Sequence, residues 1–159
     1  MERTATAVID QLPKPDTNDR STPDWFFKQC EVRYGPFDMD VAASEGNAKC
    51  KNYITASIDA FKTTWGNTNW CNCPYGPSGT IPKWIERARQ QRYEWDSRTL
   101  LLLPADTSTR WYHDVSRTEL IELVPFRLKF DSPGAVQNDS AKFGSLLLWI
   151  APQIRLEGK

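Results

Sequence analysis

The sequence predicts an α/β fold in a single domain, with strands alternating with helices early in the chain and strands dominating towards its end. Three observations point to this class. Thr68–Cys71 reads as a strand and leads through a Gly- and Pro-rich loop into an amphipathic helix pattern. Leu100–Leu103 is a continuous apolar run, which is typical of a strand covered on both faces. Ser145–Ile150 is a second such run and predicts the last core strand.

The composition is that of an ordinary soluble domain. A chain of 159 residues can bury a sizeable core, and 40% hydrophobic with 25% charged residues is an average balance. Lys plus Arg and Asp plus Glu number 20 each, so no global positive charge indicates a nucleic-acid partner, although a local basic face can exist at zero net charge. No run approaches the roughly 20 apolar residues of a membrane span, and the N-terminus does not resemble a signal peptide. We therefore expect an intracellular, cytoplasmic protein with no membrane partner.

The four cysteines are expected to be buried, reduced thiols. They are Cys30, Cys50, Cys71 and Cys73, and no two of them form a CxxC pair. The Cys71-x-Cys73 spacing does not match a zinc knuckle, and without a secretion signal a disulfide framework is not expected.

The two ends of the chain are expected to lie outside the folded domain, which then spans residues 21–151. Residues 1–20 are polar with little periodicity and are interpreted as a flexible arm, and residues 152–159 as a tail. Thr22-Pro23 predicts the first helix, because a capping residue followed by Pro is a common helix start.

Shorter elements are predicted between this helix and the central strand. Phe37–Ala43 reads as a short buried strand, on which Asp38 and Asp40 point to the same side. Residues 45–51 suit a short helix, and residues 53–55 a short extended piece. An acidic residue at a strand end, followed by small residues, can hold an ammonium group through charge-assisted hydrogen bonds. The alternative is that both Asp side chains only cap and solubilise the loop.

In the second half, apolar residues recur at helical spacing after Thr80, which is expected to cap that helix; they are Ile81, Trp84, Ile85 and Ala88. Trp111–His113 opens a short helix. Residues 119–124 and 126–130 are two extended segments separated by Pro125, which indicates a hairpin or a bent pair. The polar stretch 131–142 is interpreted as an exposed loop that can reach a substrate.

The segment that carries chemistry is Asn72-Cys73-Pro74-Tyr75, because it follows the Thr68–Cys71 strand directly. The carboxyl edge of an open α/β sheet is where ligands bind. The Asn side-chain oxygen and the Cys73 carbonyl can both accept hydrogen bonds from one exocyclic NH2 group, and the Tyr ring can stack on the base that carries the amine. The alternative is that these residues form only a turn.

Asn72-Cys73-Pro74-Tyr75 resembles the (Asp/Asn/Ser)-Pro-Pro-(Tyr/Phe) motif of amino-methyltransferases that use S-adenosylmethionine (SAM). Further segments follow in an order similar to that of the small phage-type, Dam-like DNA adenine-N6 methyltransferases, over most of residues 21–150. They are Thr22–Trp25, Phe37–Ala43, Asn47–Cys50, Leu100–Pro104, Arg110–His113 and Arg127–Phe130. The resemblance implies a reduced Rossmann-like SAM-dependent methyltransferase fold that closes with a C-terminal antiparallel hairpin.

The resemblance also implies roles for individual residues. The catalytic group would be Asn72, Cys73, Pro74 and Tyr75. Contacts with the cofactor SAM are expected from Thr22, Pro23, Asp38, Asp40, Ala42, Asn47, Asp59 and Phe61. Contacts with the substrate DNA are expected from Thr109, Arg110, Trp111, Lys129 and Lys142. No metal is expected. Cys73 stands where the family has its first Pro, so the turn loses a fixed φ but keeps the backbone carbonyl.

The implied reaction is direct methyl transfer to the exocyclic amine of an adenine that has left the duplex stack, in the cytoplasm of a bacterial host that carries a phage or prophage. Two alternatives stay open: methylation of another amide or amine, such as a protein Gln or RNA, and a catalytically degenerate protein that binds a nucleotide or a partner. A domain this small has little room for sequence readout, so we expect a homodimer or low sequence specificity.

Overall fold

The structure is a computed structural model that describes residues 21–130 and 143–154. In this part of the chain, three helices and a six-stranded sheet form an α/β domain, as predicted. The predicted arm (1–20), the polar loop (131–142) and residues 155–159 of the predicted tail lie outside the described residues. Among the helices described, none has the length and apolar character needed to cross a membrane.

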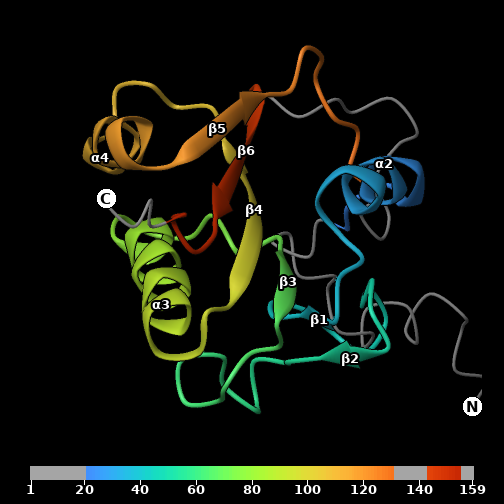
Figure 1. Ribbon diagram of the computed structural model, residues 1–159. Coiled ribbons are helices and arrows are strands. Elements are labelled where there is room, and N and C mark those ends of the chain that lie inside the picture. Colours follow the sequence, from blue (N-terminus) through green and yellow to red (C-terminus); the bar gives the residue numbers. More distant parts are fainter. Residues whose placement is uncertain (1–20, 131–142, 155–159) are drawn as a thin grey trace, which may run out of the picture.

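The sheet is mixed, because a group of four parallel strands is extended by two antiparallel pairings. Its strands are β1 (Met39–Asp40), β2 (Asn52–Tyr53), β3 (Thr68–Cys71), β4 (Arg98–Pro104), β5 (Leu120–Leu123) and β6 (Ser145–Ile150). β1 to β4 run parallel, whereas β6 runs antiparallel to both β4 and β5. The order is β2-β1-β3-β4-β6-β5, so β6, which follows β5 in the sequence, lies between β4 and β5 (Figure 1). The order also reverses at β1, because the chain adds β2 on one side of β1 and β3 on the other.

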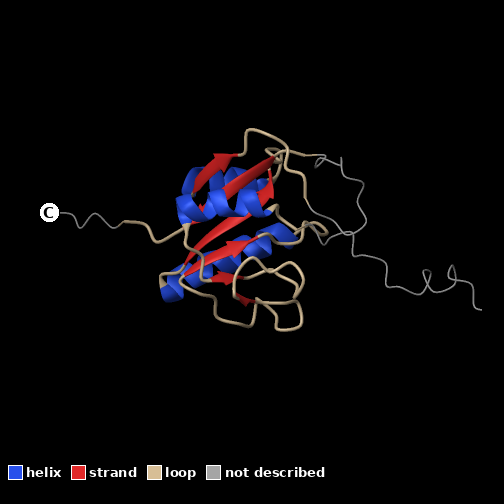
Figure 2. Cartoon of the chain, turned by 90° about the vertical axis from the view of Figure 1, so that its right-hand side faces the viewer, coloured by secondary structure: helices blue, strands red, loops and turns tan. Residues whose placement is uncertain are grey.

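Helices cover both faces of the sheet (Figures 1 and 2). They are α2 (Asp24–Tyr34), α3 (Thr80–Trp95) and α4 (Arg110–Thr118). Alternate leucines of β4 face opposite layers, since side chains alternate along a strand. Leu100 and Leu102 belong to the core cluster that contains the α2 phenylalanines, whereas Leu101 and Leu103 pack in the cluster that contains buried side chains of α3 and α4.

The strands β3 and β6 have the predicted bounds, and β4 extends the predicted Leu100–Leu103 run by a few residues. The predicted strand at 126–130 is wrong. Instead of forming a hairpin with its immediate neighbour, β5 pairs with β6, and Leu128 is buried in the α2-side core without being part of a strand. The hydrophobic pattern of residues 126–130 therefore reflects the burial of Leu128 and does not indicate a strand with one buried face.

The predicted strand Phe37–Ala43 is reduced to Met39–Asp40, and the predicted helix at 45–51 is wrong. Only a single turn forms in this loop, with the Ala48 N–H donating to the Ser44 carbonyl at 3.1 Å. Side chains accept the neighbouring N–H groups: the Ser44 N–H donates to Asn47 Oδ1 at 2.7 Å, and the Lys49 N–H donates to Asp40 Oδ2 at 3.0 Å. Polar side chains that bond locally to the backbone compete with helix formation.

Two helix starts also differ from the predictions. Gly79, with a φ of 94°, is the N-cap of α3, so Thr80 is the first helical residue and its hydroxyl donates to the Pro77 carbonyl at 2.8 Å. At α2, the N-cap is Pro23, and no side chain caps this helix. The hydroxyl of Thr22 is used elsewhere, because it accepts a hydrogen bond from Asn72.

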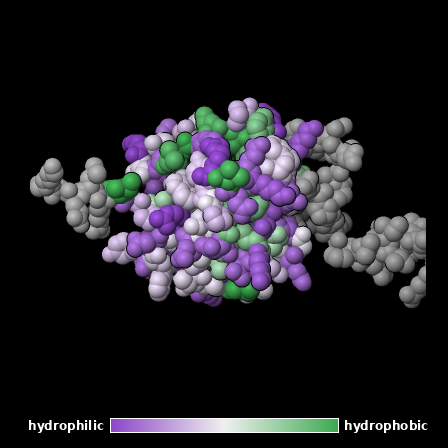
Figure 3. All heavy atoms as spheres, turned by 45° about the vertical axis from the view of Figure 1, so that its right-hand side comes forward, coloured by the Kyte–Doolittle hydropathy of each residue, from purple (hydrophilic) through white to green (hydrophobic). Residues whose placement is uncertain are grey.

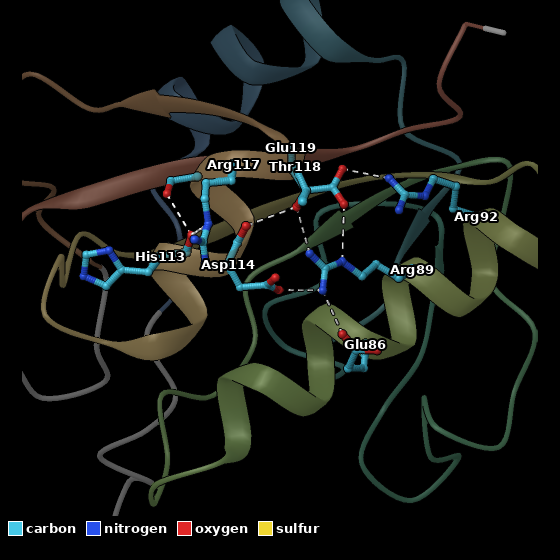
Figure 4. A network of polar contacts seen from close by, with 9 residues as sticks. Glu86, Arg89, Arg92, His113, Asp114, Arg117, Thr118 and Glu119 are labelled. Atoms are coloured by element: carbon cyan, nitrogen blue, oxygen red, sulfur yellow. Dashed lines mark hydrogen bonds and ion pairs between the residues drawn. The ribbon is translucent and has the colours of Figure 1, made fainter.

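A polar network joins α3 to α4 and to the residue before β5 (Figure 4). The Glu119 side chain, only 4% exposed, receives hydrogen bonds from Arg89 at 3.3 Å and from Arg92 at 2.7 Å. Arg89 also pairs with Asp114 at 2.8 Å and with Glu86 at 2.9 Å. The network therefore fixes the position of α4 relative to α3.

The outer surface is mostly polar. Figure 3 shows hydrophilic side chains over most of one face, with hydrophobic side chains in several separate places. The larger exposed apolar side chains come from different elements, including Trp25 of α2, Trp95 of α3 and Leu123 of β5. Exposed apolar residues that come from different elements in this way are normal for a folded domain.

Candidate active site

A cavity of about 660 Å³ lies at the carboxyl ends of β1, β2 and β3. Its lining includes the segments that directly follow these strands: Val41–Ser44 after β1, Ile54–Ala56 after β2, and Asn72 with Pro74 after β3. This is the point where the strand order reverses. Ligands of open α/β sheets bind in the crevice outside the carboxyl ends at such a reversal, and the volume is in the usual range for a small-molecule site.

Asn72 and Thr22 meet in this cavity although they are far apart in the sequence. The Asn72 amide nitrogen donates to Thr22 Oγ1 at 3.0 Å, and both residues line the cavity. Thr22 is 1% exposed. One residue precedes α2 and the other follows β3, so the hydrogen bond joins two segments that the fold brings to the same sheet edge.

Two other members of the motif, Cys73 and Tyr75, are not among the residues that line the cavity. Cys73 is buried in the core cluster on the α3 side of the sheet. The Tyr75 hydroxyl donates to the Leu102 carbonyl at 2.9 Å, and its ring meets Phe143 edge to face with centroids 5.6 Å apart. Pro74 lies between them and does line the cavity.

Asp40 ends β1 and lines the cavity as a buried carboxylate, with 3% of the residue exposed. Its Oδ1 accepts the Ala42 N–H at 3.3 Å and its Oδ2 accepts the Lys49 N–H at 3.0 Å. Burial raises the pKa of this carboxyl above its usual value, and the two backbone hydrogen bonds oppose that effect. Asp40 therefore shapes the 41–49 loop, and each oxygen keeps a second lone pair that can accept a bond from a ligand.

Another part of the cavity wall combines polar and aromatic groups. Asp59 holds a φ of 69°, in the left-handed region, and its Oδ1 accepts the Phe61 N–H at 2.9 Å. The Phe61 ring packs against Trp84 of α3 with centroids 4.8 Å apart. Asn47 lines the cavity and bonds to the Ser44 N–H. This wall offers an apolar surface with a carboxylate beside it.

Several predicted site residues lie elsewhere. Asp38 sits at the amino end of β3, where its Oδ2 accepts the Thr68 N–H at 3.0 Å, because only Asp40 of the two Asp residues lies at the carboxyl end of β1. Pro23 is buried at the start of α2 and does not line the cavity.

The predicted substrate contacts are not among the lining residues. Thr109 is the N-cap of α4, accepting the Tyr112 N–H at 3.4 Å, and Arg110 and Trp111 begin that helix. Lys129 is exposed in the segment after β5. Lys142 lies outside the described residues.

The structure adds lining residues that the sequence did not assign to the site; they include Ser21, Ser44, Lys49, Thr55, Trp70 and Trp84. Lys49 is the most informative of these, because it bonds to Asp40 through its backbone and to Asp24 through its Nζ at 2.7 Å. Lys49 belongs to the Asn47–Cys50 segment that resembles the family, and this match could have indicated that it lies at the site. Trp70 and Trp84 carry no such signal, since a core tryptophan and a cavity-lining tryptophan have the same sequence pattern.

The chain is similar in sequence to known proteins. A family model described as DNA N-6-adenine-methyltransferase (Dam) matches residues 10–156. The chain is 35% identical over 107 residues to the DNA N-6-adenine-methyltransferase of Escherichia phage T1, an alignment that covers 65% of this chain and 42% of that protein. It is 32% identical over 121 residues to the protein of the same name from Haemophilus phage HP1 (strain HP1c1), covering 74% of this chain and 68% of that protein. The chain thus spans less than half the length of the first relative and about two thirds of the second.

Proposed function

The chain belongs to the DNA N-6-adenine-methyltransferase (Dam) family, and on that premise we propose that it methylates the N6 amine of adenine in DNA, with SAM as methyl donor. The observation that carries the proposal is that Asn72 and Pro74, at the end of β3, line the same cavity as the loop after β1. The two relatives are phage proteins, so we place the reaction in the cytoplasm of a bacterial host cell.

We propose further that the fold is a reduced Rossmann-like methyltransferase sheet. Four parallel strands with helices on both faces and a reversal of strand order at β1 support this proposal. The antiparallel β5–β6 pair at the end of the chain takes the place of the expected hairpin.

The residues present in the cavity fit SAM. Asp40 can accept a hydrogen bond from an ammonium group, and the small side chains of Ala42 and Ala43 let a ligand approach the backbone beside it. Phe61 gives an apolar surface for a purine ring, and Asp59 lies next to it as a polar partner. When bound, SAM supplies an electrophilic methyl group, and the task of the protein is alignment.

Asn72 and the Cys73 carbonyl would then hold the adenine amine. The nitrogen lone pair is delocalised into the purine ring, so the amine is a poor nucleophile. Hydrogen bonds from the NH2 group to Asn72 Oδ1 and to the Cys73 carbonyl favour a pyramidal nitrogen, whose lone pair is directed towards the methyl group. Tyr75 is the proposed stacking surface for a base that has left the duplex, and its hydrogen bond to Leu102 would keep the ring in a fixed orientation.

The test is transfer of a radiolabelled methyl group from SAM to unmethylated DNA, followed by nucleoside analysis. Asn72→Ala is compared with Asn67→Ala, a matched control at the opposite end of β3 whose side chain is exposed. We expect label in N6-methyladenine for the wild type and for Asn67→Ala, and a loss of at least about 100-fold for Asn72→Ala.

The outcomes separate the candidate functions. If SAM binds but no label is transferred to DNA, DNA is rejected as the substrate and another amide or amine is favoured. A Gln-containing peptide and RNA are then the next substrates to test. No binding of SAM would favour a protein that uses the cavity to hold a nucleotide or a partner. Sedimentation of the same sample tests the expected homodimer.

A further inference from the structure

Thr22 stands at a position where its side chain would be expected to cap a helix, yet it does not do so. Pro23 is the N-cap of α2, and no side-chain hydrogen bond caps that helix. The Thr22 hydroxyl instead accepts the Asn72 amide N–H at 3.0 Å inside the cavity. A helix start without a side-chain cap is less stable than a capped one, so the alternative use of this hydroxyl calls for an explanation.

The explanation lies in the chemistry of the Asn72 amide. One end of an amide only accepts hydrogen bonds and the other end only donates them. To hold the amine of an adenine, Asn72 must present its oxygen, because its own NH2 group would face another donor. In the structure the nitrogen is the end that bonds to Thr22, so the oxygen lies on the other side of the amide.

We propose that Thr22 is a positioning residue, whose hydroxyl binds the Asn72 amide nitrogen and so orients the amide with Oδ1 on the side where the target amine would be held. The inference rests on the proposed function and deepens it, because it assigns to Thr22 a role through Asn72 instead of a direct contact with SAM. A buried hydroxyl suits this role, since water has little access to compete for the amide nitrogen.

Two substitutions separate the hydroxyl from the shape of the side chain. Thr22→Val keeps the branched shape but removes the acceptor, and Thr22→Ser keeps the acceptor. Loss of a partner that orients a functional group typically costs 10- to 100-fold, so we expect kcat to fall about 10- to 100-fold in Thr22→Val and to stay within about threefold of wild type in Thr22→Ser. The dissociation constant for SAM should change by less than about twofold in both, because the proposed role acts on the amine and not on SAM.

Thr99→Val is the matched control. Thr99 is also 1% exposed and also accepts a hydrogen bond from an asparagine amide, Asn69 Nδ2 at 3.4 Å, but it lies in β4 and does not line the cavity. Thr99→Val should lower thermal stability without lowering kcat. If a lost buried hydroxyl acted only through stability, the two valine variants would behave alike.

The double variant Thr22→Val/Asn72→Ala completes the experiment. A residue that acts through Asn72 adds no further loss once Asn72 is absent, so the double variant should equal Asn72→Ala. Unchanged kcat in Thr22→Val, or a weaker affinity for SAM with kcat retained, would overturn the inference while leaving the proposed function intact. Absence of adenine methylation by the wild type would overturn both.

Discussion

The two halves of the sheet are built in different ways. In the β4–β6 half, six residue pairs join the two strands, and Leu100, Leu101, Leu102 and Leu103 are all fully buried. In the β1–β2 half, each strand has two residues, and the loops are held by side chains that bond to backbone N–H groups, as Asp40, Asn47 and Asp59 do.

The difference separates stability from ligand binding. Long strands with apolar faces supply most of the buried area, and area removed from water is the main source of stability. Short strands leave more chain in loops, and loops on a rigid scaffold are where binding groups are usually found. We therefore expect substitutions in the β4–β6 half to change the free energy of unfolding, and substitutions in the β1–β2 half to change ligand binding.

The largest effect on unfolding is expected for Leu101→Ala. Leu101 is fully buried between β4 and the α3 layer, so truncation should lower the free energy of unfolding by about 3 kcal/mol, within the usual 2–5 kcal/mol range. Urea denaturation gives the value. The control Leu123→Ala removes the same atoms from a residue that is 60% exposed and should change the stability by less than about 0.5 kcal/mol. Equal losses in the two variants would contradict the division.

Glu119→Gln should have the next largest effect. The variant leaves Arg89 and Arg92 without their shared carboxylate at a site where the Glu119 side chain is 4% exposed. We expect a loss of about 1–3 kcal/mol, the range for a hydrogen bond to a charged group. The same urea series measures it, with SAM affinity as the second readout. A change in SAM affinity without a change in stability would show that this network belongs functionally to the cavity half.

Asp40→Asn tests the cavity half. An amide has one acceptor where the carboxylate has two, so it cannot accept both the Ala42 and the Lys49 N–H groups, and the 41–49 loop should loosen. We expect SAM to bind about tenfold or more weakly by calorimetry, with a change in stability of about 1 kcal/mol. Asp38→Asn changes a side chain that precedes β1 and accepts the Thr68 N–H at the amino end of β3, and it should leave SAM affinity unchanged. Weaker binding in both variants would restore Asp38 to the site.

The smallest effect is a pH dependence of opposite sign in the two halves. A hydrogen bond from Arg33 lowers the pKa of Glu122 below 4.5, so its contribution to stability is present above pH 4.5 and is lost as the pH falls through the folded-state pKa. Burial raises the pKa of Asp40 above 3.8, so that carboxyl favours the folded state at low pH and loses this contribution as the pH rises. Glu122→Gln should reduce the loss of unfolding free energy between pH 7 and pH 3.5 by at most about 1 kcal/mol, as measured from urea denaturation midpoints at the two pH values. A larger loss in the variant than in the wild type would contradict the stabilising role of ionised Glu122.

The sequence predicted the scaffold half better than the cavity half. The leucine runs of β4 and β6 follow a pattern that tertiary contacts reinforce, so their positions could be predicted. The 41–51 loop could not, because its path depends on Asp40 accepting an N–H nine residues later and on Asn47 accepting the Ser44 N–H. The motif Asn72–Tyr75 located the sheet edge, but the partner of Asn72 was predicted as a helix cap. A hydrogen bond across 50 residues leaves no local periodicity to read.

The insertion of β6 between β4 and β5 has a consequence for biosynthesis. While a ribosome is still translating the segment before residue 145, β4 has an apolar edge without the strand that later covers it, and β5 lacks the strand with which it pairs. Residues 145–150 must therefore leave the exit tunnel before the β4–β6 and β5–β6 pairs of the sheet can form. A messenger RNA truncated before the codons for residues 145–150 would yield a protein in which the leucine-rich strand β4 has an unpaired edge. Such edges are a known route to aggregation and are targets for chaperones and proteases.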